Sequence, residues 1–309
     1  MENHTKATPE FILVGFKSHP GLQLLLSVLF STLYVATVVG NACMIFIIRM
    51  DSKLHTPMYF FLENLSILDM SYSSVIAPKA VLTFSGGRRI ISYNACASQM
   101  FFFSLFGTTE AFLLAVMAYD RFTAICNPLL YQIIMNKRLC VLLVVGSYLS
   151  GCINCTIQTG FTFSLSFCGP TEINHFFCDV PAVMYASCSD TLVNEIVMLA
   201  VCGSIIVGTA FMVFISYSYI IITIVQMPSV ESRRKAFSTC SSHILAVSLF
   251  FGTVFFMYAE PGAKTSPDKS STVSILYTIV IPMLNPFIYT FQNNDVKGSL
   301  KKHLKRKSF

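Results

Sequence analysis

The sequence predicts an all-α membrane protein: a bundle of seven transmembrane helices followed by a short amphipathic helix at the C-terminus. The 309 residues are 54% hydrophobic and only 12% charged, whereas soluble domains carry about 25% charged residues. Five long stretches contain no Asp, Glu, Lys or Arg, and two more are apolar apart from a few placed charges. Because a bilayer core about 30 Å thick requires roughly 20 apolar residues of helix, each stretch can cross it once.

Seven such spans use over half of the chain and leave no room for a soluble domain of ordinary size. We therefore expect one membrane domain over residues 1–309, with short loops and tails. The tails are 1–21 and 292–309, and the spans lie at about 22–48, 57–82, 92–127, 139–163, 194–226, 236–258 and 271–291.

Turn residues mark the borders of these spans. Pro57 suits the first turn of the second helix, where its missing N–H would have no helical partner anyway. Gly86 and Gly87 interrupt the chain before the third span, and Pro228 lies in the turn after the fifth. Pro261 and Gly262 end the sixth span.

The C-terminal tail has the pattern of an amphipathic helix. Val296, Leu300 and Leu304 recur every four residues and form one apolar stripe, while Lys and Arg residues fill the other positions. Such a basic segment after the last span is expected to lie on the inner leaflet, with membrane lipids as its partner.

The basic residues predict the orientation of the chain. With the N-terminus outside, the inner loops and tail hold Lys and Arg in a two-to-one excess over the outer segments. The sequon at Asn3 agrees, because N-glycosylation requires a lumenal site. We expect a multi-pass plasma-membrane protein with an extracellular N-terminus and a cytoplasmic C-terminus. The net charge of +6 then reflects this bias, so we expect no nucleic-acid partner.

Four of the charged residues within the spans matter most, because charge is costly there and usually functional. Asp69 and Glu110 are near mid-depth, where they could meet Asn41 and Asn285. Two carboxylates close together in a low dielectric cannot both ionise cheaply. Either they share a proton or a cation, or the group is a hydrogen-bonded cluster that fixes helix packing. The sequence leaves both interpretations open.

The other two charged residues, Asp120 and Arg121, lie at the inner end of the third span. They could form a latch that opens toward a cytoplasmic partner, or a static pair that snorkels to the interface. The spacing alone favours the static pair. In the seventh span, Pro286 permits a kink next to Tyr289, which is compatible with a moving part.

The cysteines divide by compartment. Cys96, Cys168, Cys178 and Cys188 fall outside, where disulfides persist, and allow three connectivities. The segment from His175 to Asp179 could bind a metal, but a disulfide would consume the Cys178 thiolate, so we expect no metal site. No nucleophile–base pair or other catalytic constellation stands out, so we do not expect an enzyme.

Several segments resemble one family. The chain resembles vertebrate odorant receptors of the rhodopsin-like G-protein-coupled class, in their tetrapod-type branch. The resemblance covers nearly the whole chain and rests on HTPMYFFL at 55–62, MAYDR at 117–121, AICNPL at 124–129, KAFSTCSSH at 235–243 and PMLNPFIY at 282–289.

The resemblance implies a receptor for small volatile, mostly hydrophobic ligands. It implies coupling to a stimulatory olfactory-type heterotrimeric G protein that raises cyclic AMP, and no cofactor beyond a candidate sodium ion. The alternative class is a small-molecule transporter or channel, which would be expected to show inverted repeats and several midplane charges. The sequence has two mid-depth carboxylates and no visible repeat.

The resemblance also assigns roles to residues. It implies the disulfides Cys96–Cys178 and Cys168–Cys188, and a sodium or polar site at Asn41, Asp69, Glu110 and Asn285. It implies that Asp120, Arg121, Tyr217, Pro286 and Tyr289 act in G-protein coupling and activation. It implies a ligand pocket lined by Phe103, Ser104, Gly107, Thr108, Val201, Ile205, Phe251, Val254 and Tyr258.

Some positions depart from the family pattern. Phe122 and Thr123 replace the more common Tyr-Val, and Phe251 stands where a Tyr is usual, which removes a hydroxyl from the pocket floor. Glu63 is an extra carboxylate in the second span. After Tyr289, the run that includes Gln292 and Asn294 lacks the common Arg and Lys.

Overall fold

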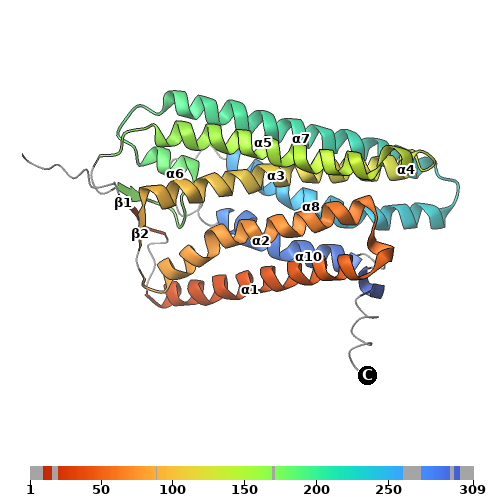
Figure 1. Ribbon diagram of the computed structural model, residues 1–309, viewed down its shortest axis with the longest axis horizontal. Helices are drawn as coiled ribbons and strands as arrows, with labels where there is room; N and C mark the ends of the chain where they lie inside the picture. Colours follow the sequence, from red (N-terminus) through yellow and green to blue (C-terminus); the bar gives the residue numbers. More distant parts are fainter. Residues whose placement is uncertain are drawn as a thin grey trace, which may run out of the picture.

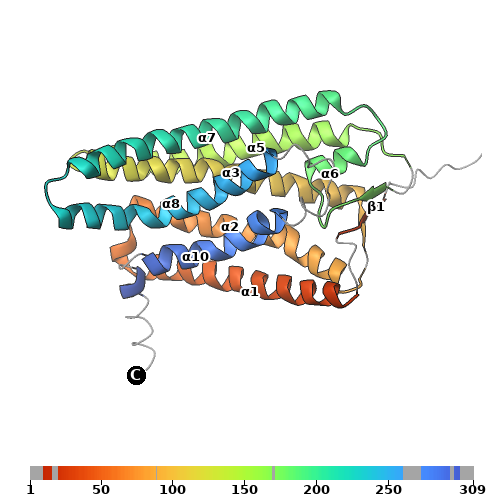
Figure 2. The same cartoon turned by 180° about the vertical axis from the view of Figure 1, so that it is seen from behind.

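The computed structural model describes residues 10–15, 20–87, 89–168, 171–259, 273–292 and 296–299. Long helices lie side by side along the long axis of the molecule and form one bundle (Figures 1 and 2). Their bounds are α1 Pro20–Met50, α2 Pro57–Phe84, α3 Tyr93–Cys126, α5 Lys137–Phe163, α7 Leu192–Gln226 and α8 Val230–Ala259. The seventh helix begins at residue 273, passes through a π-helical segment, η2 (Leu276–Val280), and continues as α10 (Ile281–Gln292). The predicted seven-helix bundle is therefore confirmed.

The third helix is the centre of the bundle. α3 packs against α2, α5 and α7, whereas α1 packs against α2 and α10. α3 and α5 approach each other closely at Gly151, where a Cβ atom would collide with the Thr109 hydroxyl and lie 2.8 Å from the Leu105 carbonyl oxygen. A small residue at a helix contact lets two backbones approach closely in the membrane, so Gly151 fixes how α5 is seated on α3.

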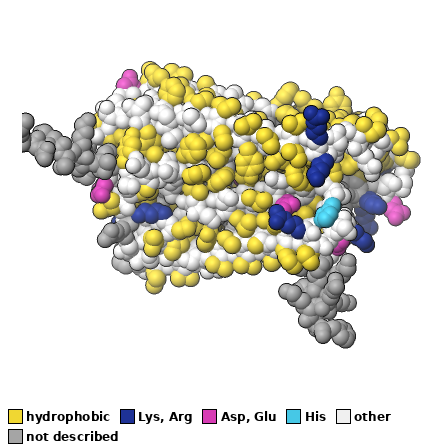
Figure 3. Space-filling model, in the orientation of Figure 1, with side chains coloured by type: hydrophobic (Ala, Val, Ile, Leu, Met, Phe, Trp, Pro, Cys, Tyr) yellow, Lys and Arg dark blue, Asp and Glu magenta, His cyan; other side chains and the backbone are white. Residues whose placement is uncertain are grey.

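The surface is suited to lipid. Large apolar side chains of α1, α5 and α7 are exposed, and hydrophobic groups cover much of the visible flank of the bundle (Figure 3). Among the described residues, six helices are long and apolar enough to cross a membrane. The exception is α2, which carries Glu63, Asp69 and Lys79. All three charges have partners. Glu63 pairs with Arg49, Asp69 accepts hydrogen bonds from Asn285, and Lys79 Nζ donates to the Ile90 carbonyl oxygen.

The sixth helix is longer than its apolar stretch. We expected a span from about residue 236, but α8 begins at Val230 and includes the exposed charged residues Glu231, Arg233, Arg234 and Lys235. Hydropathy detects the membrane-crossing part of a helix, whereas helical structure can continue into water, where charged side chains are well solvated. The extra turns carry basic charge at the end of the bundle that also holds α4.

One end of the bundle carries a small sheet that the sequence analysis did not predict. β1 (Glu10–Leu13) pairs antiparallel with β2 (Ile90–Ser92) and parallel with β3 (Thr171–Ile173). Phe11 and Leu13 of β1 are fully buried. Strands of three or four residues are too short for an alternating pattern to be recognised, so only the tertiary contacts reveal them. We call this the sheet end.

Short elements complete the loops. They are η1 (Ser52–Leu54), α4 (Tyr131–Ile134) and α6 (Val180–Tyr185). Residues 296–299 form the described part of the C-terminal helix. Val296 is buried there, and Ser299 Oγ donates a 2.7 Å hydrogen bond to Asp51 Oδ2. The expected stripe partners Leu300 and Leu304 lie outside the described residues.

Candidate functional site

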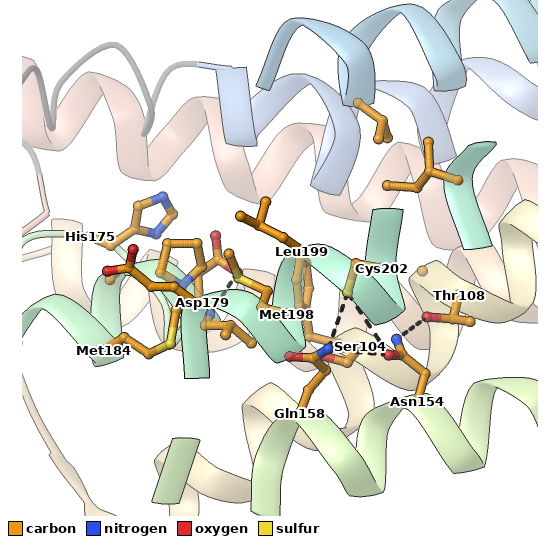
Figure 4. Close-up of a pocket in the computed structure, with 18 of the residues that line it drawn as sticks. Ser104, Thr108, Asn154, Gln158, His175, Asp179, Met184, Met198, Leu199 and Cys202 are labelled. Carbon is orange, nitrogen blue, oxygen red and sulfur yellow. Dashed lines mark hydrogen bonds between the residues drawn. The ribbon is translucent and has the colours of Figure 1, made fainter. Parts of the chain in front are cut away.

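A cavity of about 740 Å³ lies within the bundle toward the sheet end. Side chains of α3, α5, α7 and α8 and of the long loop before α7 line it (Figure 4). A volume of this size suits a small molecule, since ligand pockets commonly measure about 300–1,000 Å³. Its lining is more apolar than polar, which suits a hydrophobic ligand.

Six of the nine residues expected in a ligand pocket line this cavity: Phe103, Ser104, Gly107, Thr108, Ile205 and Val254. Val201 and Phe251 do not line it, and their neighbours Cys202 and Phe250 do. Phe251 packs instead, partly buried, on the central hydrophobic core. One residue along a helix turns the side chain by about 100°, so a one-residue difference selects a different face. The side chain of Tyr258 lies outside the described residues.

The sequence analysis did not assign any residue of α5 to the ligand pocket. Asn154 and Gln158 of α5 line the cavity and are each only 3% exposed. They are four residues apart in an otherwise apolar span, so they share one helix face. That spacing of two amides was a readable signal. The loop residues His175 and Asp179 also line the cavity, and no spacing in the sequence could place them there.

Two disulfides fix the loop above the cavity. Cys96 of α3 is bonded to Cys178, and Cys168 is bonded to Cys188. These are the pairings that the family resemblance implied, out of three possible ones. The backbone N–H of Cys178 also donates to Gln99 Oε1 at 3.0 Å. The loop is thus tied to α3 both covalently and by a hydrogen bond.

Two titratable groups lie in this loop. Burial lowers the pKa of His175 to about 3, so its imidazole is neutral at pH 7. Its Nε2 lies 3.1 Å from Ser274 Oγ. Burial raises the pKa of Asp179 to about 6, and this carboxylate accepts a hydrogen bond from the N–H of Val180 at the start of α6. The loop therefore brings one buried acid to the cavity.

The segment from His175 to Asp179, considered above as a metal site, has a thiol that is no longer available as a ligand. Cys178 is consumed by its disulfide. Within the part of the chain that the structure describes, no three His, Cys, Asp or Glu side chains are grouped so as to hold a metal ion.

The mid-bundle polar residues come together below the cavity. Asn285 Nδ2 donates to both oxygens of Asp69, at 3.2 and 3.1 Å. Glu110 is buried and close enough to Asp69 to repel it electrostatically. Asn41 Nδ2 donates to the carbonyls of Thr37 and Pro282 rather than to a carboxylate. The group therefore joins α1, α2, α3 and α10.

This cluster is not fully hydrogen-bonded within the protein. No described side chain donates to the Glu110 carboxylate, and the Oδ1 atoms of Asn41 and Asn285 and the Tyr289 hydroxyl are buried without a described partner. A cluster that served only to fix helix packing would be expected to satisfy its members. Oxygen atoms left free beside two carboxylates are suited to a proton or a small cation.

At the other end of α3, Asp120 and Arg121 form a buried ion pair. Arg121 Nη2 lies 2.7 Å from Asp120 Oδ2, and the two side chains are 9% and 1% exposed. Tyr131 of α4 donates its hydroxyl proton to Asp120 Oδ1 at 2.8 Å. The pair is enclosed by protein and does not snorkel to a surface. We call this region the Arg121 end.

The resemblance also assigned a role in activation to Tyr217, Pro286 and Tyr289. The Tyr217 hydroxyl is 2.6 Å from His243 Nδ1, which links α7 to α8. Pro286 lies inside α10, where α1 approaches it at Gly40. Tyr289 is 1% exposed. These residues therefore connect α7 with α8 and α10 with α1.

The structure also places several departures from the family pattern. Glu63 forms a 2.6 Å ion pair with Arg49 of α1, on the outside of the bundle. Phe122 packs against the ring of Tyr219, and the Thr123 hydroxyl donates to backbone carbonyls of its own helix. The glycosylation candidate Asn3, the Gln292 side chain and Asn294 lie outside the described residues.

Comparisons with known proteins agree with one another. A family model described as "Olfactory receptor" matches residues 30–307. The chain is 55% identical over 308 residues to olfactory receptor OR9H1 of Homo sapiens, covering all of both chains. It is 51% identical to olfactory receptor 5AP2 of Mus musculus, covering 98% of this chain and 95% of that one.

A solved structure with the same arrangement is squid rhodopsin. The two align with a TM-score of 0.71 at 15% sequence identity, over 94% of this chain and 87% of the other. At this identity the similarity concerns the fold alone. It extends through the whole helical bundle.

Proposed function

This chain belongs to the olfactory receptor family, a class of non-enzymatic membrane receptors, and on that premise we propose how it works. It binds small volatile, mostly hydrophobic odorants in the cavity. The bound state activates a stimulatory olfactory-type heterotrimeric G protein and so raises cyclic AMP. A transporter or channel is not favoured by the family or by the fold.

The observation that carries the proposal is the connection between the cavity and the Arg121 end. The same helices, α3, α7 and α8, line the cavity and hold Arg121, Tyr217 and His243 at their other ends. An agonist that binds one arrangement of these helices better than another shifts the population toward it. A change in the cavity can therefore alter the surroundings of Arg121.

The cavity sets the scale of affinity. For an odorant of about ten heavy atoms, ligand efficiency allows at best roughly micromolar to nanomolar binding. Few polar side chains are available to anchor the ligand, so we expect affinity near the micromolar end.

The Asp120–Arg121 pair is proposed as the output switch. In this structure the guanidinium is held by Asp120, which Tyr131 also engages. The pairing loosens on activation, and Arg121 then meets the G protein. Tyr217, Pro286 and Tyr289 are proposed to take part in the accompanying helix movement.

The mid-bundle cluster is proposed to hold a sodium ion or a proton. Asp69, Glu110, Asn41 and Asn285 supply carboxylate and amide oxygens, the ligands that hard cations prefer. The unpartnered Oδ1 atoms of the two asparagines support this assignment. A cation there would offset the repulsion between the two carboxylates.

We further propose that the sheet end faces outward and that the Arg121 end faces the cytoplasm of the cell. The disulfides at the sheet end suit an oxidising compartment. Visible Lys and Arg side chains gather mainly toward the opposite end (Figure 3), in keeping with positive-inside topology. The N-terminus would then be extracellular, with Asn3 glycosylated.

The test is the response of Arg121→Ala in a cyclic-AMP reporter cell challenged with an odorant panel. Loss of odorant-evoked cyclic AMP at unchanged surface level is expected, because the G-protein contact is removed. Arg138→Ala is the matched control, since Arg138 is an exposed arginine at the start of α5, at the same end. Full signalling by Arg121→Ala contradicts the role of that residue, and a ligand-evoked current in cells lacking downstream channels favours the transporter or channel class.

A further inference from the structure

Five polar side chains of the cavity, from three helices, form one group. Ser104 and Thr108 of α3, Asn154 and Gln158 of α5, and Cys202 of α7 lie together (Figure 4). We call these five residues the polar wall. Elsewhere α7 and α8 present the apolar side chains Met198, Leu199, Ile205, Ile206, Phe250 and Val254. A ligand in this part of the cavity therefore meets polar groups on one side and apolar side chains of α7 and α8 on the other.

Asn154 is the fixed member of the polar wall. Its Nδ2 donates to Thr108 Oγ1 at 2.8 Å, and both residues are buried. This bond ties α5 to α3 and leaves Asn154 Oδ1 directed at Gln158, whose Nε2 lies 3.5 Å away. An oxygen of Gln158 at that position would face another oxygen, so the amide is oriented with its nitrogen toward Asn154.

This orientation leaves the Gln158 carbonyl oxygen free. Its Nε2 faces Asn154 Oδ1 and Cys202 Sγ, the latter at 3.4 Å. No described residue donates to Oε1, although Gln158 is only 3% exposed and lines the cavity. An amide oxygen that lines the cavity and has no donor among the described residues is an open hydrogen-bond acceptor. A ligand that donates a hydrogen bond would satisfy it.

The polar wall also has hydrogen-bond donors to offer. The hydroxyl protons of Ser104 and Thr108 are not given to any described residue, since the only bond of Thr108 Oγ1 is the one it accepts from Asn154. Ser104 lies one helical turn before Thr108 on α3. The wall therefore offers an acceptor and hydroxyl donors within the same part of the cavity.

The charge of the cavity narrows the ligand class further. Its described charged lining residues are Asp179 and Glu195, and no Lys or Arg of the described chain lines it. A carboxylate ligand would be desolvated beside two acids with no cation to pair with. The imidazole of His175 is neutral at pH 7 and supplies no positive charge. The cavity is therefore unsuited to anionic odorants.

We infer that Gln158 is a specificity-determining residue for neutral alcohols and phenols, whose hydroxyl donates to Gln158 Oε1 and accepts from a hydroxyl of the polar wall. The inference rests on the proposed function, because it concerns the same cavity. A hydroxyl group is both a donor and an acceptor, whereas an ether can only accept and a hydrocarbon does neither. An alcohol can thus bind both the acceptor and a hydroxyl donor of the polar wall.

The test compares ligands that share a skeleton and differ in one group. For straight, branched, cyclic and aromatic skeletons of about ten heavy atoms, the alcohol, its isomeric methyl ether, the hydrocarbon and the carboxylate are added to the purified full-length receptor in lipid nanodiscs. The readout is the rise in unfolding temperature with ligand concentration. We expect the alcohol of at least one skeleton to bind about tenfold more tightly than the matched ether, and the carboxylate to be the weakest.

The variant Gln158→Leu separates recognition from packing. It should remove the preference for the alcohol over the ether and change the binding of the ether and hydrocarbon by less than about threefold. Gln158→Met is a second variant of similar shape in case the first folds poorly. Thr156→Val is the matched control, because Thr156 is exposed on the other side of α5. It should keep the preference.

The outcomes are distinct. If no alcohol on any skeleton binds more tightly than its ether, the inference is overturned, whether or not other ligands bind. If Gln158→Leu weakens all ligands equally and lowers the unfolding temperature of the empty receptor, Gln158 is a packing residue and the inference is also overturned. An alcohol preference that depends on Gln158, in a receptor that evokes no cyclic AMP, supports the inference and contradicts the proposed signalling.

Discussion

The sheet end and the Arg121 end of this bundle are held together by different kinds of interaction. At the sheet end two disulfides, a three-stranded sheet and a cluster of aromatic rings fix the loop over the cavity. At the Arg121 end the described cysteines Cys126, Cys140 and Cys240 are free, and the helices are joined by the Asp120–Arg121 pair and hydrogen bonds. A disulfide keeps its two residues together through any movement of the folded protein, whereas an ion pair or a side-chain hydrogen bond can be exchanged for another. The cavity is therefore preorganised for binding at the sheet end, whereas the helices can rearrange at the Arg121 end.

The largest effect is expected from removing the Cys96–Cys178 disulfide. In the double variant Cys96→Ser and Cys178→Ser we expect a loss of about 2–5 kcal/mol and little receptor at the cell surface, because this bond closes a loop of 82 residues in the unfolded chain. Surface labelling in intact cells measures the amount of receptor at the cell surface. Cys43→Ser, at an exposed free cysteine of α1, is the control. Normal surface levels in the double variant would mean that the sheet end does not depend on its covalent link.

The second test concerns β1. Phe11 is fully buried, with its ring centroid 5.1 Å from that of Phe167. Phe11→Ala should cost about 3–5 kcal/mol through the cavity it leaves, seen as a lower unfolding temperature in detergent. Glu10→Ala, at the exposed neighbour in the same strand, should change little. Equal effects of the two variants would show that the sheet is not part of the folded core.

The third test uses pH at the sheet end. Burial raises the pKa of Asp179 from 3.8 to about 6, so its ionised form is disfavoured in the folded state. Above pH 6 the ionised Asp179 carboxylate lowers the free energy of unfolding by about 3 kcal/mol, since a shift of one pKa unit corresponds to about 1.4 kcal/mol. The cost disappears as the pH falls from 6 toward 4, where the folded protein takes up a proton that the unfolded chain does not yet bind.

Asp179→Asn removes this titration and keeps a side-chain oxygen able to cap α6. The variant should therefore unfold at a higher temperature than the wild type at pH 7.5, and the difference should shrink between pH 6 and pH 4. Unfolding temperatures across that range provide the measurement. A difference that is constant with pH would mean that the Asp179 carboxylate is stabilised by its surroundings and carries no burial cost.

The smallest effect is expected at the Arg121 end. Tyr131→Phe removes the 2.8 Å hydrogen bond to Asp120 and weakens the hold on the ion pair by about 1–2 kcal/mol. Basal cyclic AMP should rise about five- to thirtyfold at unchanged surface level, because the resting arrangement loses stability. Tyr219→Phe, at a neighbouring exposed tyrosine, is the control. If Tyr131→Phe lowered surface expression as the disulfide variant does, the two ends would not differ as described.

The sequence alone determined the seven spans and the charged positions within them. Hydropathy and the cost of burying charge depend on residue type and on position along one helix, so they can be read locally. Asp69 and Glu110 were placed near mid-depth in this way, and the structure has both buried. Arg121, for which the spacing favoured a pair snorkelling to the interface, is buried as well. The length of α8 was underestimated, because its charged first turns lie beyond the apolar stretch.

Only the tertiary structure decided which side chains meet. Whether Val201 or Cys202, and Phe250 or Phe251, faces the cavity depends on the rotation of each helix about its axis, which the packing of neighbouring helices sets. The meeting of Gln158 with Asn154 and Cys202 joins two helices and depends on how α5 is seated at Gly151. The sheet likewise joins β1 to segments about 80 and about 160 residues further along the chain. Contacts between distant segments leave no periodic pattern in the sequence, which is why the polar wall and the sheet emerged only from the fold.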